Sequence, residues 1–253
     1  MIMSETYVQD GRTVEVKAMF EDAQWYLKNR NYHVRVRTHM VQEFLEHEKI
    51  ECMLDIGCGD GSISVPLLKP DRKLTLLDLS QSMLNIAQSR VPAELSDNVE
   101  VLNEHFMHAQ FEPGSYDLII CVGVLAYIDD EQAFVEKLAS LVRPGGKLFT
   151  ECTDSKHFMS RLARSYDRVR NLFGKPRVHL AGHSGKNIAD RFKKAGFQLA
   201  ATYRYCSPPR PLRKLFNQNF HYQMIRSFFG NFTRNTAAWL GNECIFYFKK
   251  PLK

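Results

Sequence analysis

Several features are missing from this chain of 253 residues, and each absence excludes a class of protein. No run approaches the roughly 18 apolar residues that a membrane-spanning helix needs. The first residues, MIMSETYVQDGRTVEV, contain neither the basic nor the apolar segment of a signal peptide. The six cysteines are scattered without a CxxC pair. A thiol in or beside an expected strand usually acts as a small buried hydrophobe, so we expect reduced cysteines, no metal site and a cytoplasmic protein.

Acidic residues are also missing from one long stretch. Between Arg191 and Asn242 there is no Asp or Glu, whereas nine residues are Lys or Arg. Residues 1–155 hold 14 basic against 25 acidic side chains, a balance of −11, and residues 156–253 carry +17. The net charge of +6 hides this division. We therefore predict that one side of the molecule meets an anionic partner.

Apolar runs alternate with helical segments along the chain. A helical segment is expected over residues 13–48, and helices are expected after Gly61 and in SMLNIAQSR, DEQAFVEKLASLV and KNIADRFKKAG. Strands are expected at CMLDIG, KLTLLDLS, VEVLNEHF, YDLIICVGVLAYI, KLFTECT, FQLAATYRY and CIFYFKK. This alternation predicts an α/β fold, doubly wound and Rossmann-like, with a seven-stranded, mostly parallel sheet. Residues 1–48 would form an N-terminal helical cap, and residues 49–253 one domain with a helical insertion, 207–242, before the last strand.

The stretch MLDIGCGDGSISVPLL, residues 53–68, ends an expected strand on three alternating glycines. One interpretation is a tight strand-to-helix turn. A second is a dinucleotide site, although the sixth position of that motif is Ser62 rather than Gly or Ala. A Walker loop is excluded because the chain has no Gly-Lys-Ser/Thr. Ligands of such sheets bind beyond the carboxyl ends of the strands, which is where this turn lies.

Five segments in order resemble the class I S-adenosylmethionine (SAM) dependent methyltransferases. The pattern D-x-G-x-G-x-G from Asp55 to Gly61 is similar to their motif I, and Asp78 ends the next strand, 21 residues after Gly57. The segments DLSQSMLNIA, YDLIICVGVLAYIDD and LVRPGGKLF resemble the stretch after that acid, the fourth strand and the turn into the fifth. The resemblance covers about residues 35–205. It implies SAM as the cofactor and methyl transfer as the reaction.

The resemblance also implies roles for residues at the strand ends. Glycines would let the backbone approach the amino-acid and ribose parts of SAM, and Asp55 would place negative charge near its ammonium and sulfonium groups. Asp78 would accept both ribose hydroxyls. Arg37 has the spacing of the residue that pairs with the SAM carboxylate, and Arg35 competes for that role. The expected cofactor-binding residues are Arg37, Asp55, Gly57, Cys58, Gly59, Gly61, Asp78, Leu79, Met83, Glu104, His105, Phe106, Cys121 and Val122.

After the third strand the chain departs from the family pattern. The family carries an acid there that accepts from the adenine amino group, and here that position is His105. Either Glu104 takes the role with a slip of one residue, or His105 and the backbone do. Phe106 is expected to pack on the purine.

The acceptor side has several candidate residues. A hydroxyl acceptor needs a base, whereas an acceptor that is already nucleophilic needs only alignment. Tyr127 and His157, in loops after the fourth and fifth strands, are the expected catalytic residues, with His179 and His183 as alternatives. The segment VGVLAYI resembles the small-molecule members of the family. The expected substrate contacts are Tyr26, Tyr32 and His183.

The insertion SPPRPLRKLFNQNFHYQMIRSFFGNFTRNTAAWLGN leaves three interpretations open. Leu212, Phe216, Phe220 and Met224 recur at four-residue spacing. The apolar stripe continues through Ile225, Phe228, Phe229 and Phe232, with basic residues at Arg213, Lys214, Arg226 and Arg234. We expect a cap over the acceptor whose apolar stripe faces the pocket. A basic amphipathic helix on an anionic membrane surface is an alternative. A contact with RNA is another.

Together these features predict a SAM-dependent methyltransferase acting on oxygen or nitrogen of a small-molecule acceptor, either anionic or long and apolar. One alternative is a methyltransferase acting on tRNA or a membrane lipid, which would associate the protein with nucleic acid or with a membrane. The other is a SAM-binding fold with different chemistry.

Overall fold

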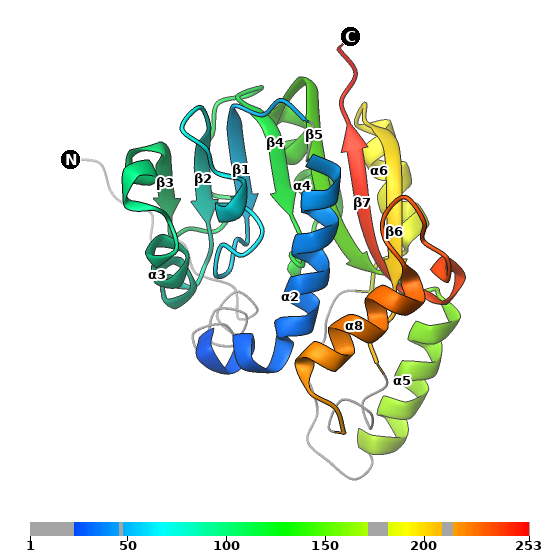
Figure 1. Ribbon diagram of the computed structural model, residues 1–253. Helices are drawn as coiled ribbons and strands as arrows, with labels where there is room; N and C mark the ends of the chain where they lie inside the picture. Colours follow the sequence, from blue (N-terminus) through cyan, green and yellow to red (C-terminus); the bar gives the residue numbers. More distant parts are fainter. Residues whose placement is uncertain (1–22, 46–47, 172–181, 209–214, 253) are drawn as a thin grey trace, which may run out of the picture.

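A computed structural model describes residues 23–45, 48–171, 182–208 and 215–252 (Figure 1). Its seven strands form one sheet in the order β3-β2-β1-β4-β5-β7-β6. Neighbours from β3 to β5 are parallel, and β7 runs antiparallel to β5 and β6. The predicted seven-stranded, mostly parallel sheet is confirmed. The strands are β1 (Cys52–Ile56), β2 (Lys73–Leu77), β3 (Val99–Leu102), β4 (Tyr116–Cys121), β5 (Val142–Thr153), β6 (Gln198–Tyr205) and β7 (Glu243–Lys249).

Helices cover both faces of the sheet, as a doubly wound fold requires. The α-helices are α2 (Ala23–Leu45), α3 (Gln81–Ser89), α4 (Glu131–Leu141), α5 (Phe158–Asn171), α6 (Gly185–Lys194) and α8 (Gln218–Phe229). Side chains of α2, α3 and α8 share one apolar core, and those of α4 and α6 share the other. Successive strand residues point to opposite faces, so Met53 enters the first core and Leu54 the second.

The helix expected after Gly61 does not form. That segment contains only turns and η1 (Val65–Leu67), a short 3₁₀ helix. Pro66 explains the difference, because proline lacks the N–H that an α-helical hydrogen bond needs and its ring clashes with the preceding turn. The other 3₁₀ helices are η2 (Ala93–Asn98), η3 (Leu125–Tyr127) and η4 (Ala238–Leu240).

The insertion before the last strand is helical, as predicted, and packs against the N-terminal helix. Arg226 of α8 forms an ion pair with Glu43 of α2 at 2.6 Å. The Tyr222 hydroxyl lies 2.9 Å from His39 Nδ1. These contacts join two segments that are far apart in the sequence (Figure 1).

The apolar residues of the insertion divide between two faces. Tyr222, Ile225 and Phe229 are buried on the side of α8 that packs against α2. Phe216, Phe220 and Met224 are partly exposed, at 45%, 46% and 37%. Packing of the insertion on the domain agrees with a cap, whereas its position over an acceptor stays a prediction. Leu212 lies outside the described residues.

Neighbouring substitutions on α8 test this packing. Ile225 is 1% exposed, so Ile225→Ala should lower the free energy of unfolding by about 2–5 kcal/mol through lost burial and an unfilled cavity. Met224→Ala, one residue away on the outer face, should change it by no more than about 0.5 kcal/mol. Chemical denaturation measures both, and equal losses would contradict the observed orientation of α8.

Candidate functional site

The glycine turn is anchored to the end of the neighbouring strand. The backbone N–H groups of Gly57 and Cys58 donate to the carbonyl oxygen of Leu77 at 2.8 and 3.1 Å. The N–H of Gly59 donates to Asp78 Oδ2 at 2.8 Å. The predicted carboxylate of the second strand and the predicted glycine turn of the first are therefore in direct contact.

The three glycines of the turn meet different surroundings. All have left-handed backbone angles, with φ of +66° at Gly57, +54° at Gly59 and +71° at Gly61. A Cβ at Gly57 would lie 2.5 Å from the Val124 side chain, and one at Gly61 would lie 2.7 Å from the Val65 side chain. A Cβ at Gly59 would meet no atom within 4 Å. The chain itself fills the space at two of the glycines, and only Gly59 faces open space.

Asp78 lies between this turn and the start of α3. Its Oδ1 accepts from the backbone N–H of Ser80 at 2.9 Å. Ser80 caps α3, because its hydroxyl accepts from the N–H of Met83. The amide of Asn103, which sequence reasoning missed, donates to the carbonyl oxygens of Asp78 and Leu79 at 3.0 Å each. Asn103 thus fixes the ends of β2 and β3 together.

Asp55 is a buried carboxyl group next to the turn, with 2% of its surface exposed. Burial raises its pKa to about 7, an interaction with the Ser64 side chain opposes this shift, and the negative charges of Asp78 and Asp60 add to it. Its Oδ2 has no hydrogen-bond partner among the described residues. A positive ligand group placed beside it would favour the ionised form and lower this pKa.

The three residues after β3 that were expected around the adenine differ in how deeply they are buried. Glu104 is exposed, whereas His105 is half-buried and its Nδ1 accepts from the Met107 N–H at 3.3 Å. Phe106 is 4% exposed, and its ring packs against that of Phe134 with centroids 5.2 Å apart. The geometry does not support the expected packing of Phe106 on a purine, because this ring belongs to the core under α4. Met83 is likewise buried, at 1% exposed.

Cys121 and Val122, at the end of β4, are both buried. Gly123 follows them, and a Cβ there would lie 3.1 Å from Nη1 of Arg37. Arg37 therefore reaches from α2 to the carboxyl end of β4. The competing Arg35 points elsewhere, since its guanidinium lies 3.9 Å from the centre of the Tyr222 ring on α8.

Arg37 is held by a buried polar chain that sequence reasoning did not find. Its Nη2 lies 2.5 Å from Oε2 of Glu151, which is 2% exposed. The Tyr205 hydroxyl donates to the other oxygen of Glu151 at 2.9 Å, and burial keeps the pKa of this phenol well above its usual value. His33 Nδ1 lies 3.3 Å from the same hydroxyl, and its Nε2 lies 3.0 Å from the Ser207 hydroxyl. These hydrogen-bonded residues come from separate segments of the sequence, so only folding brings them together.

His183 connects three segments near the end of β4. It is 3% exposed, with Nδ1 2.6 Å from a Glu131 carboxylate oxygen and Nε2 2.6 Å from the Leu125 carbonyl oxygen. Arg191 pairs with the second oxygen of Glu131 at 2.9 Å. Both ring nitrogens are therefore engaged, which leaves no free nitrogen for a substrate. The contact instead holds η3, where Tyr127 lies half-buried.

His157 lies at the start of α5. Its Nδ1 accepts from the N–H of Met159 at 3.3 Å, and its Nε2 lies 3.0 Å from the carbonyl oxygen of Trp239. Both nitrogens bond to backbone, a pattern typical of a residue that fixes a helix start.

Tyr32 is 1% exposed, with ring centroids 4.3 Å from His33 and 5.5 Å from His221. This ring is packed among α2 and α8 and is not open to an acceptor. The side chain of Tyr26 and all of His179 lie outside the described part of the chain.

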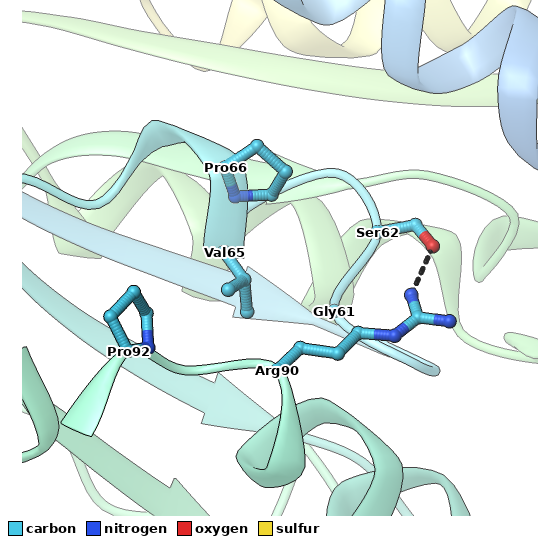
Figure 2. Close-up of a pocket in the computed structure, with 6 residues that line it drawn as sticks. All are labelled: Gly61, Ser62, Val65, Pro66, Arg90 and Pro92. Atoms are coloured by element: carbon cyan, nitrogen blue, oxygen red, sulfur yellow. Dashed lines mark hydrogen bonds between the residues drawn. The ribbon is translucent and has the colours of Figure 1, made fainter.

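A hollow of about 350 Å³ lies next to Gly61. Figure 2 shows the residues that line it, which are Gly61, Ser62, Val65, Pro66, Arg90 and Pro92. Arg90 extends along it, donates to the Ser62 hydroxyl at 2.6 Å and forms an ion pair with Asp60 at 2.6 Å. Its lining contains none of the residues at the ends of β2 and β4, namely Asp78, Cys121 or Val122. The hollow therefore shares only Gly61 with the expected cofactor-binding residues.

Comparison with known proteins agrees with the fold. Residues 54–148 match a family model described as a methyltransferase domain. A ubiquinone biosynthesis O-methyltransferase from Pectobacterium carotovorum is 34% identical over 98 residues, which are 38% of this chain and 41% of that protein. The chain spans 41–58% of the length of two such relatives, so it covers about half of each.

Solved structures of similar fold have diverse chemistry. Magnesium protoporphyrin IX methyltransferase from Synechocystis PCC 6803, solved with bound S-adenosylhomocysteine (SAH), has a TM-score of 0.63 at 17% identity. The match covers 95% of this chain and all of that one. The [4+2]-cyclase SpnF has a TM-score of 0.63 at 15% identity, covering 95% of this chain and 97% of that one. These likenesses concern the fold.

The residues present at the turn suit SAM. Gly59 offers open space against the backbone, Asp78 places a half-buried carboxylate beside it, and Asp55 has a buried oxygen without a partner. SAM has hydroxyls that a carboxylate accepts and positive groups that a second carboxylate stabilises.

Substituting alanine at Gly59 and at Gly61 distinguishes an effect on cofactor binding from an effect on packing within the protein. Gly59→Ala should cost about 1–2 kcal/mol of stability from its left-handed backbone and weaken SAH binding at least tenfold, because the new Cβ enters the open space. Gly61→Ala should cost about 1–3 kcal/mol more, because its Cβ overlaps Val65 and lies 3.1 Å from Ala87. Thermal denaturation and calorimetric titration measure the two effects. Unchanged SAH affinity in Gly59→Ala would place the ligand elsewhere.

The seven described strands form one sheet, in which the antiparallel β7 lies between β5 and β6. The glycine turn and Asp78 occupy the carboxyl ends of its first two strands. Residues 54–148 match the methyltransferase domain model, and the described part of the chain has the same fold as SAM-dependent methyltransferases of known structure.

Proposed function

We propose that this protein binds SAM at the Gly59–Asp78 edge of the sheet and transfers its methyl group to a small-molecule acceptor. The contact between Asp78 and the open glycine turn carries this proposal, because it presents a carboxylate and free backbone surface side by side. The O-methyltransferase names of the sequence relatives favour oxygen as the methylated atom.

Bound SAM supplies an electrophilic methyl group on a sulfonium. The acceptor oxygen forms a bond to this methyl carbon as the carbon–sulfur bond breaks, and the acceptor proton leaves to a base or to water. In this proposal Asp78 holds the ribose, and Arg37 pairs with the carboxylate of the cofactor's amino-acid part. Glu151 positions Arg37 by fixing its guanidinium beside Gly123.

Tyr127 is the catalytic candidate that the proposal retains. It follows β4, where the acceptor would approach the methyl group, and η3 is fixed there by the contact from His183 to Leu125. His157 is less suited to act as a base, because both of its ring nitrogens already bond to backbone groups. Alignment of the acceptor supplies much of the acceleration in such a displacement.

We also propose that the protein contacts an anionic membrane surface from one side, where an apolar acceptor would be found. The excess of positive charge after residue 156 supports this proposal. Among the described residues, no helix combines the length and the apolar character needed to cross a bilayer.

Substitution of Asp78 tests the cofactor site and the reaction together. Asp78→Ala should weaken SAH binding by about 1.5–3 kcal/mol, the scale of hydrogen bonds to a charged group, which is roughly 10- to 150-fold. Asp71→Ala, an exposed carboxylate before β2, is the control and should bind SAH normally. Calorimetric titration gives both affinities.

The wild-type protein should transfer labelled methyl from SAM to a molecule in the low-molecular-weight fraction of a cell extract, and Asp78→Ala should transfer much less. Label found only in RNA or in protein would contradict the small-molecule acceptor. SAH binding without any transfer of label would contradict methyl transfer itself, because the fold alone does not fix the chemistry.

A further inference from the structure

Helix α5 projects from the molecule with little packing of its own. It follows β5 and lies with α8 at the end of the sheet to which β1 to β5 point (Figure 1). Residues 161–166 and 168 are all exposed, and within the part whose side chains are described only Ser160 is buried. A helix of this length is marginal in water without tertiary contacts, so its outer faces are expected to serve an interaction.

One face of α5 is apolar although it is exposed. Phe158, Leu162 and Tyr166 follow one another at four-residue spacing and are 48%, 63% and 47% exposed. This spacing places them on one stripe of the helix. Trp239 extends the stripe, because it is 69% exposed and stacks on Phe158 with ring centroids 6.3 Å apart.

Helix α8 adds a second exposed stripe at the same end of the sheet. Its members are Phe220, Met224 and Phe228 of α8 together with Phe216 just before the helix, and Phe228 is 53% exposed. The rings of Phe216 and Phe220 stack with centroids 4.4 Å apart. We call the two stripes with Trp239 the outer apolar surface. Exposed apolar side chains in such number mark an interaction site.

Arginines flank the apolar stripe of α5. Arg161, Arg164 and Arg168 are exposed, and no ion pair joins any of them to a carboxylate within the described ranges. Arg164 donates to the Ser155 carbonyl oxygen at 2.6 Å, which leaves its positive charge uncompensated. By contrast, Arg226 of α8 is neutralised by Glu43. Of the two helices, α5 therefore carries more basic residues without a carboxylate partner in the described ranges, with Asp167 as its acidic residue.

We infer that the outer apolar surface docks on an anionic lipid bilayer, with α5 as the main contact. This inference rests on the proposed membrane contact and identifies the elements that make it. A helix with an apolar stripe and flanking arginines fits the boundary between headgroups and acyl chains. A two-fold contact with a second copy would bring the same unpaired arginines face to face, which opposes it. The rings of this surface could also stack on bases, so RNA is the competing partner, and retention of the protein on RNA without sedimentation with vesicles would overturn the inference.

Docking in this way has a consequence for the active site. The outer apolar surface lies beyond the carboxyl ends of the strands, which is also where the glycine turn and Asp78 lie (Figure 1). The lipid surface would thus meet the side of the molecule from which an apolar acceptor enters. Methyl transfer would occur next to the bilayer.

Vesicle sedimentation tests the inference. The wild-type protein should sediment with vesicles of phosphatidylglycerol and phosphatidylcholine, and much less with phosphatidylcholine alone. Changing Arg161, Arg164 and Arg168 together to Gln should weaken partition into the vesicles on the order of 100-fold. Each basic residue near an anionic surface strengthens partition by roughly fivefold, and the variant loses three. High salt should mimic this loss. Leu162→Gln should weaken binding without a change in charge.

The control removes the same formal charge from α6, which packs on the face of the sheet opposite α8, although Lys186 there pairs with Asp190 at 3.0 Å. Lys186, Lys193 and Lys194 are exposed there, and changing all three to Gln should leave sedimentation close to that of the wild type. Equal losses in the two triple variants would overturn the role of α5, because net charge alone would then explain binding.

SAH titration of every variant separates this inference from the proposed function. Normal SAH affinity together with no sedimentation of the wild-type protein would overturn the membrane contact and leave methyl transfer standing. A stable dimer in solution that Leu162→Gln dissociates would assign the surface to a second copy and overturn the inference.

Discussion

The hydrogen bond from the Gly59 N–H to the Asp78 carboxylate is the contact on which the site depends. It fixes a turn with three left-handed residues, which only glycine adopts without strain. The same bond places a carboxylate of β2 at the open backbone of β1. Val124 and Val65 fill the space at the other two glycines, so the turn is rigid where the protein packs on it and open at Gly59 alone.

The charge division of the sequence has a spatial counterpart. Asp55, Asp60 and Asp78 gather around the turn, and this concentration of carboxylates helps to raise the pKa of Asp55. Such a site favours a ligand with positive groups. The unpaired arginines of α5 lie on a separate outer surface, where they suit an anionic partner. The two halves of the chain thus place opposite charge at two different parts of the structure.

Most of the fold was predictable, because hydrophobic periodicity and turn residues can be recognised within short segments of the sequence. The strands, the helical insertion and the places of the motif I turn and Asp78 at strand ends follow from patterns within short segments. Pro66 stops the expected helix after Gly61, a signal that was present in the sequence. The buried polar contacts that hold Arg37 were not predictable, because they join residues of α2, β5 and β6. They link Arg37 to Glu151, Tyr205 and His33. Which apolar residues of α8 are buried also depended on its partner helix, because the sequence alone does not show that Ile225 and Phe229 pack on α2.

A crystal structure of the protein with SAH tests the central claim most directly. The account predicts that both ribose hydroxyls lie within hydrogen-bond distance of the Asp78 carboxylate, and that the amino-acid part passes the backbone of Gly59 toward Arg37. The Gly57–Gly61 turn should keep its observed conformation. SAH bound in the hollow beside Arg90, or with its ribose away from Asp78, would contradict the account.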